Sequence, residues 1–149
     1  MNFTSKEEMQ YARACLAFAK KLGLIDDDSP DALQKRCEEE NSKREMMLKS
    51  GEAVYGVTHF SLPAYLQYEL TGFKLNFVSE NEEIKRVYEY KPISYEEKVE
   101  FYEKNSDLFT RYAGDSFHFK EVEAVIEKRI REAEFENEIQ NILCQLTDR

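Results

Sequence analysis

Residues 41–70 constrain the fold most, because they hold the end of one helix, an apolar crossover and the start of another helix. Lys49, Ser50 and Gly51 predict the helix end, since a cation suits the negative end of the helix dipole and glycine adopts the left-handed conformation that follows it. Ser61 and Pro63 predict the next helix start, since a serine hydroxyl caps free amides and proline is tolerated in a first turn.

The crossover between these two signals, residues 52–60, is too apolar for a solvated linker. We expect it to be ordered and to pack on the core. Gly56 within it allows a backbone turn that a larger residue would resist.

Apolar periodicity predicts an all-α fold: one irregular helical domain, residues 1–149, of five or six helices. A capping box at Ser5–Glu8 opens the first helix, which ends at Gly23, and a second start signal lies at Ser29 and Pro30. The predicted helices after the first are 31–49, 61–78, a short one around 84–88, 94–105 and 119–146. The last would be about 40 Å long, and we expect it to pack on the N-terminal helices. A short strand at 73–77, where apolar residues also alternate, is the alternative to a continuous third helix.

The composition limits the classes of partner. The chain has 149 residues and a net charge of −9. This charge argues against nucleic-acid binding, which requires clustered Lys and Arg. No apolar run is long enough for a membrane span, and no signal peptide is present, so the chain as given would be cytoplasmic, or extracytoplasmic if a signal or lipid anchor was removed. Polypeptides are the partners we expect.

The residue types that usually carry catalysis or bind metals form no pattern here that supports an enzyme or a metal site. The three cysteines, Cys15, Cys37 and Cys144, are far apart in sequence and are expected to be core residues without a zinc or disulfide pattern. The aspartates at 26–28 lack the ligand spacing of a calcium loop and suit a helix start instead. The two histidines, His59 and His118, match no nucleophile or metal motif. The sequence therefore predicts no catalytic residue, no metal and no cofactor.

Aromatic residues are the unusual feature, with nine Tyr, ten Phe and no Trp. Tyrosine offers a large rigid contact area with a polar tip, which suits surfaces that hold peptides. A tyrosine-rich core is the alternative interpretation.

A resemblance to a known family rests on residues 39–44, 51–56, 60–61 and 65–68, then 93–97 and 101–109, and on 119–143 as a returning C-terminal helix. These segments resemble the SurA/PrsA-like foldases, bacterial chaperones with a parvulin-type prolyl isomerase module. The resemblance implies one SurA-N-like chaperone domain. Only about ten residues separate Phe109 from Phe119, where the family commonly carries its isomerase module, so isomerase activity is not implied.

The resulting hypothesis is a chaperone-like domain that binds unfolded or extended polypeptide in an aromatic groove. Its predicted peptide-binding residues are Tyr55, Phe60, Tyr65, Tyr68 and Tyr112. The alternative is a dedicated protein-interaction or regulatory subunit that docks on one folded partner protein. An enzyme that uses His59 or His118 is a third possibility.

Overall fold

The computed structural model describes residues 6–54, 56–110 and 117–147. Tyr55 and Tyr112, and the predicted cap Ser5, lie outside these ranges. The described residues form six α-helices, one short 3-10 helix and no strand. The elements are α1 (Lys6–Lys21), α2 (Pro30–Lys49), α3 (Leu62–Val78), α4 (Glu82–Lys85), α5 (Tyr95–Lys104), η1 (Ser106–Phe109) and α6 (Phe119–Thr147). The predicted all-α class is confirmed.

Local signals in the sequence set most of the helix starts. The hydroxyls of Ser29, Ser61 and Ser94 accept hydrogen bonds from the amides of Ala32, Ala64 and Glu97, and so cap α2, α3 and α5. Proline follows the first two caps in the first turn, as predicted.

The alternative of a strand at 73–77 is wrong, because α3 continues to Val78. Phe73 and Phe77 are one helical turn apart and both are buried, so they lie on the same face of the helix. Packing on that one face favours the helix over the alternating pattern.

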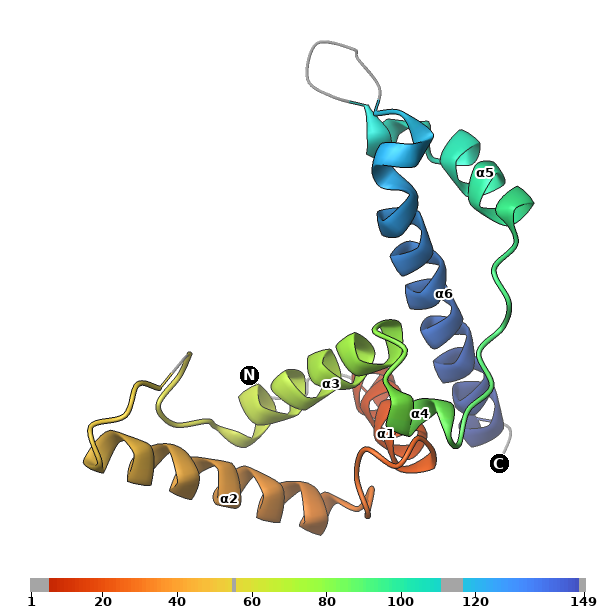
Figure 1. Cartoon of the computed structure of the whole chain (residues 1–149). Coiled ribbons are helices and arrows are strands. Elements are labelled where there is room, and N and C mark those ends of the chain that lie inside the picture. The colour runs from red at the N-terminus through yellow and green to blue at the C-terminus, as the bar shows by residue number, and fades with distance from the viewer. Residues whose placement is uncertain (1–5, 55, 111–116, 148–149) are drawn as a thin grey trace.

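The long C-terminal helix packs on the N-terminal part of the chain, as predicted. Figure 1 shows α6 passing beside α1 and the end of α3 with its C-terminal half, while its N-terminal half extends beyond them. This N-terminal half carries α5 and η1, and α2 lies alongside α3 in the other arm. The helices thus form two arms, one made of α1, α2 and α3 and the other of α5, η1 and α6. A connector, residues 86–94, runs from α4 back along α6 to α5.

The hydrophobic core has three parts that follow this arrangement. One joins α1, α2 and α3, and a second joins α1, α3, α4 and the C-terminal half of α6 around Phe18 and Phe77. The third is smaller and joins α5, η1 and the N-terminal half of α6 around Phe109 and Ile126.

The crossover between α2 and α3 is less buried than predicted. Gly51 has a φ angle of +81°, the left-handed conformation expected of it, and Gly56 has a φ angle of +82°, which a larger residue would resist. Phe60 packs into the core, but Val57 is about half exposed. The crossover is therefore anchored mainly at its C-terminal end.

Candidate functional site

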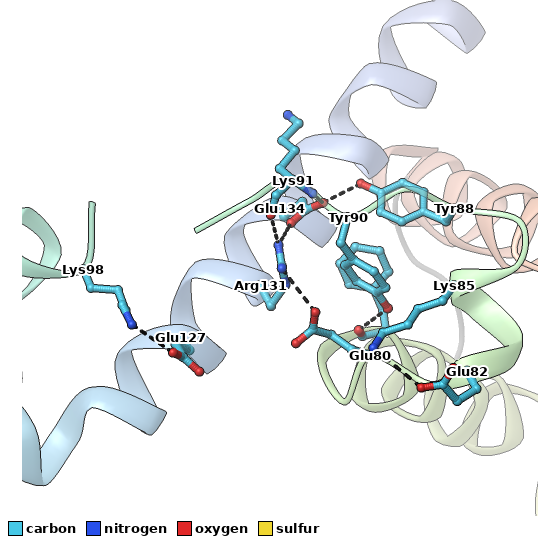
Figure 2. Close-up of polar contacts among 11 residues, drawn as sticks. Glu80, Glu82, Lys85, Tyr88, Tyr90, Lys91, Lys98, Glu127, Arg131 and Glu134 are labelled. Carbon is cyan, nitrogen blue, oxygen red and sulfur yellow. Dashed lines mark hydrogen bonds and ion pairs between the residues drawn. The ribbon is translucent and has the colours of Figure 1, made fainter. Parts of the chain in front are cut away.

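A buried polar cluster lies where α6 meets the connector and the end of α3. Arg131 and Glu134 are only 7% and 5% exposed, and Arg131 Nη1 lies 2.5 Å from Glu134 Oε1. Figure 2 shows Tyr88, Lys91 and Glu80 converging on this pair.

The partners come from the connector and from the turn that follows α3. Tyr88 O–H and Lys91 N–H donate to Glu134 Oε2 over 2.7 and 3.1 Å. Arg131 donates to the Lys91 carbonyl over 2.6 Å and to Glu80 Oε1 over 3.2 Å. These contacts tie the connector and the end of α3 to α6.

Tyr90 supports the cluster from one side. The Arg131 guanidinium lies 4.8 Å from the centre of the Tyr90 ring, an attractive cation–π distance, and Tyr90 O–H donates to the Phe77 carbonyl over 2.5 Å. Burial raises the pKa of Tyr90 to about 12 and also raises that of Tyr88, which additionally donates to Glu134. Both tyrosines therefore remain protonated hydrogen-bond donors at neutral pH.

One donor of the cluster remains unsatisfied. The Nε–H of Arg131 is buried and has no acceptor among the residues that the structure describes. Buried donors are rarely left in this state, because an unmade hydrogen bond costs about 1–3 kcal/mol.

A cavity of about 360 Å³ lies next to this cluster, between residues 91–93 of the connector, α5 and α6. We call it the α5–α6 cavity. Its apolar lining comes from all three elements and consists of Pro92, Ile93, Phe101, Ile130 and Ala133. Arg131 and Glu134 form part of its wall, and its volume lies in the range of about 300–1,000 Å³ that is usual for small-molecule sites.

Ion pairs hold α5 in place beside α6. Lys98 Nζ lies 2.8 Å from Glu123 Oε1 and 3.1 Å from Glu127 Oε1, and both residues are on α6. The hydrogen bonds to these carboxylates raise the pKa of Lys98. The α5 helix has no fully buried residue, so these pairs contribute to its position.

Of the predicted aromatic residues, the structure describes Phe60, Tyr65 and Tyr68, and it brings these three rings into contact with one another. Phe60 and Tyr65 are each 7% exposed and belong to the core of the α1–α3 arm, while the Tyr68 ring, 51% exposed, lies against Phe60 at 5.1 Å between ring centres. Tyr55 and Tyr112 lie outside the described residues.

A second polar network lies beneath these aromatic residues. Glu40 and Arg44, one turn apart on α2, form an ion pair, with 3.0 Å between Arg44 Nε and Glu40 Oε1. Arg44 is buried, its guanidinium 4.7 Å from the centre of the Phe60 ring. The neighbouring pair of Arg36 and Glu69, two-pronged at 2.8 and 3.0 Å, gave no local signal because its members are far apart in sequence.

No metal-binding cluster of three or more His, Cys, Asp or Glu side chains occurs in the described ranges. His59 and His118 are both exposed and lie in separate parts of the fold, one before α3 and one before α6. Cys15 and Cys37 are buried as expected, whereas Cys144 is exposed. None of the helices in the part of the chain that the structure describes has the length and apolar character needed to cross a bilayer.

Comparison with known proteins gives a likeness to a glycoside hydrolase. No family model and no curated protein matches the chain. The native and selenomethionine crystal structures of the GH136 lacto-N-biosidase from Eubacterium ramulus both match, with a TM-score of 0.78, 25% sequence identity and coverage of 91% of this chain. The chain spans only 28% and 27% of those two chains.

This likeness overturns the predicted resemblance to SurA/PrsA-like foldases, and with it the chaperone function and the groove for unfolded peptides. The comparisons do not support the alternative of a dedicated regulatory subunit either. The physical reason is that helix caps and apolar stripes specify helices, and many unrelated helical domains share them.

Proposed function

We propose that this chain is a helical domain with a carbohydrate-related role, and that it binds oligosaccharide without cleaving it. The observation that carries the proposal is the likeness to part of a lacto-N-biosidase over 91% of the chain. Because the chain corresponds to about a quarter of that enzyme, the likeness favours a domain that serves glycoside hydrolysis over a complete hydrolase.

Two carboxylates of the chain, Asp27 and Glu100, are unsuited to act as the acid of a glycoside hydrolase. Most glycoside hydrolases use two carboxyl groups across the scissile bond, and one of them needs a raised pKa to act as an acid. In this chain the pKa of Asp27 is lowered by the Ser29 amide that donates to it, and the pKa of Glu100 is lowered by Lys104. Both shifts are opposite to the one that a general acid needs.

Glu134 is the most buried carboxylate of the α5–α6 cavity wall, and its contacts give it a structural role. It accepts hydrogen bonds from Tyr88 O–H, Lys91 N–H and Arg131. A residue held in this way positions its neighbours.

The test is titration of the purified chain with neutral disaccharides in a calorimeter. The set contains lacto-N-biose, the disaccharide in the name of the similar enzyme, together with cellobiose and maltose. We expect saturable binding of at least one of them and no release of monosaccharide on prolonged incubation. A disaccharide concentration of about 10 mM detects interactions weaker than about −4 kcal/mol. Absence of binding by every disaccharide at that concentration would overturn the proposed function. Hydrolysis by the chain alone would overturn its non-catalytic part.

A further inference from the structure

We infer that the α5–α6 cavity is the oligosaccharide-binding site of this chain and that it takes an uncharged sugar. The inference rests on the proposed function and assigns it to a place. A sugar ring has an apolar face of C–H groups and an edge of hydroxyl groups, so its site needs an apolar floor with hydrogen-bonding groups around it. The α5–α6 cavity has both.

The apolar floor of the cavity comes from rigid elements on two sides. Phe101 on α5 contributes an aromatic ring, and Ile130 on α6 and Ile93 on the connector contribute aliphatic surface. The Phe101 ring is itself supported by Phe109, with 6.3 Å between ring centres. Aromatic rings provide large rigid contact area at little entropic cost, which suits the flat face of a sugar.

The polar edge of the cavity offers donors and acceptors that the fold does not use. The side chain of Asn137 makes no hydrogen bond within the part of the chain that the structure describes, and its amide can both donate and accept. Asn105 donates to the Phe101 carbonyl over 3.0 Å, which leaves its own oxygen as an acceptor. Hydroxyl groups also donate and accept, so side-chain amides are matched partners for them.

The wall of the cavity is held rigid where Arg131 forms part of it. Arg131 is more than nine-tenths buried, and its Nε–H is enclosed by protein and does not face the cavity. Three of its four Nη N–H groups donate to Glu134, Lys91 and Glu80, so the fold fixes the shape of this wall.

The charge of the cavity favours a neutral ligand. Three cations and three carboxylates line it, so the lining has no net formal charge in a chain whose net charge is −9. Two of the cations are already paired, Arg131 with Glu134 and Lys104 with Glu100, each at 2.5 Å. A phosphate or carboxylate ligand would therefore meet no excess of positive charge.

The experiment compares Asn137→Ala and Phe101→Leu with the parent chain by calorimetric titration with lacto-N-biose, cellobiose and maltose. Asn141→Ala is the matched control, because Asn141 is an exposed asparagine one turn along the same helix that does not line the cavity. We expect Asn137→Ala to weaken binding about 3- to 10-fold, the loss of one hydrogen bond, and Asn141→Ala to leave it within about 2-fold.

Phe101→Leu keeps an apolar side chain and removes the aromatic ring. We expect it to weaken binding about 2- to 10-fold, and a thermal melt confirms that each variant is folded before titration. Parent-like affinity in both cavity variants would overturn the assignment of the site while the proposed function stands. Absence of binding by the parent would overturn the proposed function itself. Tighter binding of glucose 1-phosphate than of the three neutral sugars would overturn the uncharged class.

Discussion

Replacing Glu134 with alanine tests the cluster that joins the two arms. The change removes the carboxylate that Tyr88, the Lys91 amide and Arg131 share. The Arg131 guanidinium would remain buried with the Lys91 carbonyl and with Glu80, whose side chain is 41% exposed. Removing one partner of a buried ion pair costs about 3–5 kcal/mol, because the other charge is left without compensation.

This cost is large compared with the total stability of a domain, which is about 5–15 kcal/mol. Glu134→Gln keeps the shape and one acceptor oxygen, but it loses the charge and replaces the other oxygen by an NH2 group that cannot accept, so we expect a smaller cost of about 1.5–3 kcal/mol. Glu132→Ala is the matched control on the same helix. Its exposed pair with Arg129, at 3.4 Å, is worth less than about 1 kcal/mol.

Urea unfolding followed by circular dichroism gives the free energy of unfolding of each variant. The expected order of destabilisation is Glu134→Ala, then Glu134→Gln, then Glu132→Ala. If Glu134→Ala unfolds within about 1 kcal/mol of the parent, then the cluster does not hold the connector and α3 to α6.

Three further outcomes are expected. A thiol reagent at pH 8 should modify Cys144 rapidly and Cys15 only after unfolding, because Cys15 is buried and burial raises its pKa to about 12. Rapid modification of all three cysteines in the folded chain would contradict this. The pKa of Tyr90 is about 12 in the folded chain and about 10 when unfolded. Its contribution to stability is therefore complete below pH 10 and lost between about pH 10 and 12. The urea midpoint should fall over that interval, and a constant midpoint would refute this expectation. Gly72→Ala should raise the free energy of unfolding by about 1 kcal/mol, because a Cβ there meets no atom within 4 Å. Gly51→Ala should lower it by about 1 kcal/mol, because the φ angle of Gly51 is +81°. Equal effects of the two changes in urea unfolding would refute the backbone argument.

The helices were predictable because their signals are local. A cap such as Ser61 bonds an amide three residues away, and Gly51 adopts its left-handed conformation directly after the helix it ends. Both effects act within one turn of chain, so they can be read without knowledge of the fold. The same locality explains the wrong family resemblance, since local signals do not specify how helices pack.

The candidate site was not predictable for the opposite reason. Arg131 bonds Lys91 and Glu80, which are 40 and 51 residues away, and only Glu134 lies within the same turn of helix. The α5–α6 cavity likewise exists only once the connector has folded back beside α6. Burial of Tyr65 was also hidden, because periodicity identifies a helix face but not what covers it.

The most direct measurement is chemical-shift mapping of the isotope-labelled chain during titration with lacto-N-biose. A carbohydrate-binding role centred on the α5–α6 cavity predicts shifts that saturate and are largest at residues 91–93, in α5 and at Ile130, Ala133 and Asn137 of α6. Saturating shifts confined to α2 and α3 would place the sugar elsewhere. A spectrum that does not change at about 10 mM sugar, where millimolar binding is detectable, would contradict the carbohydrate-related role itself.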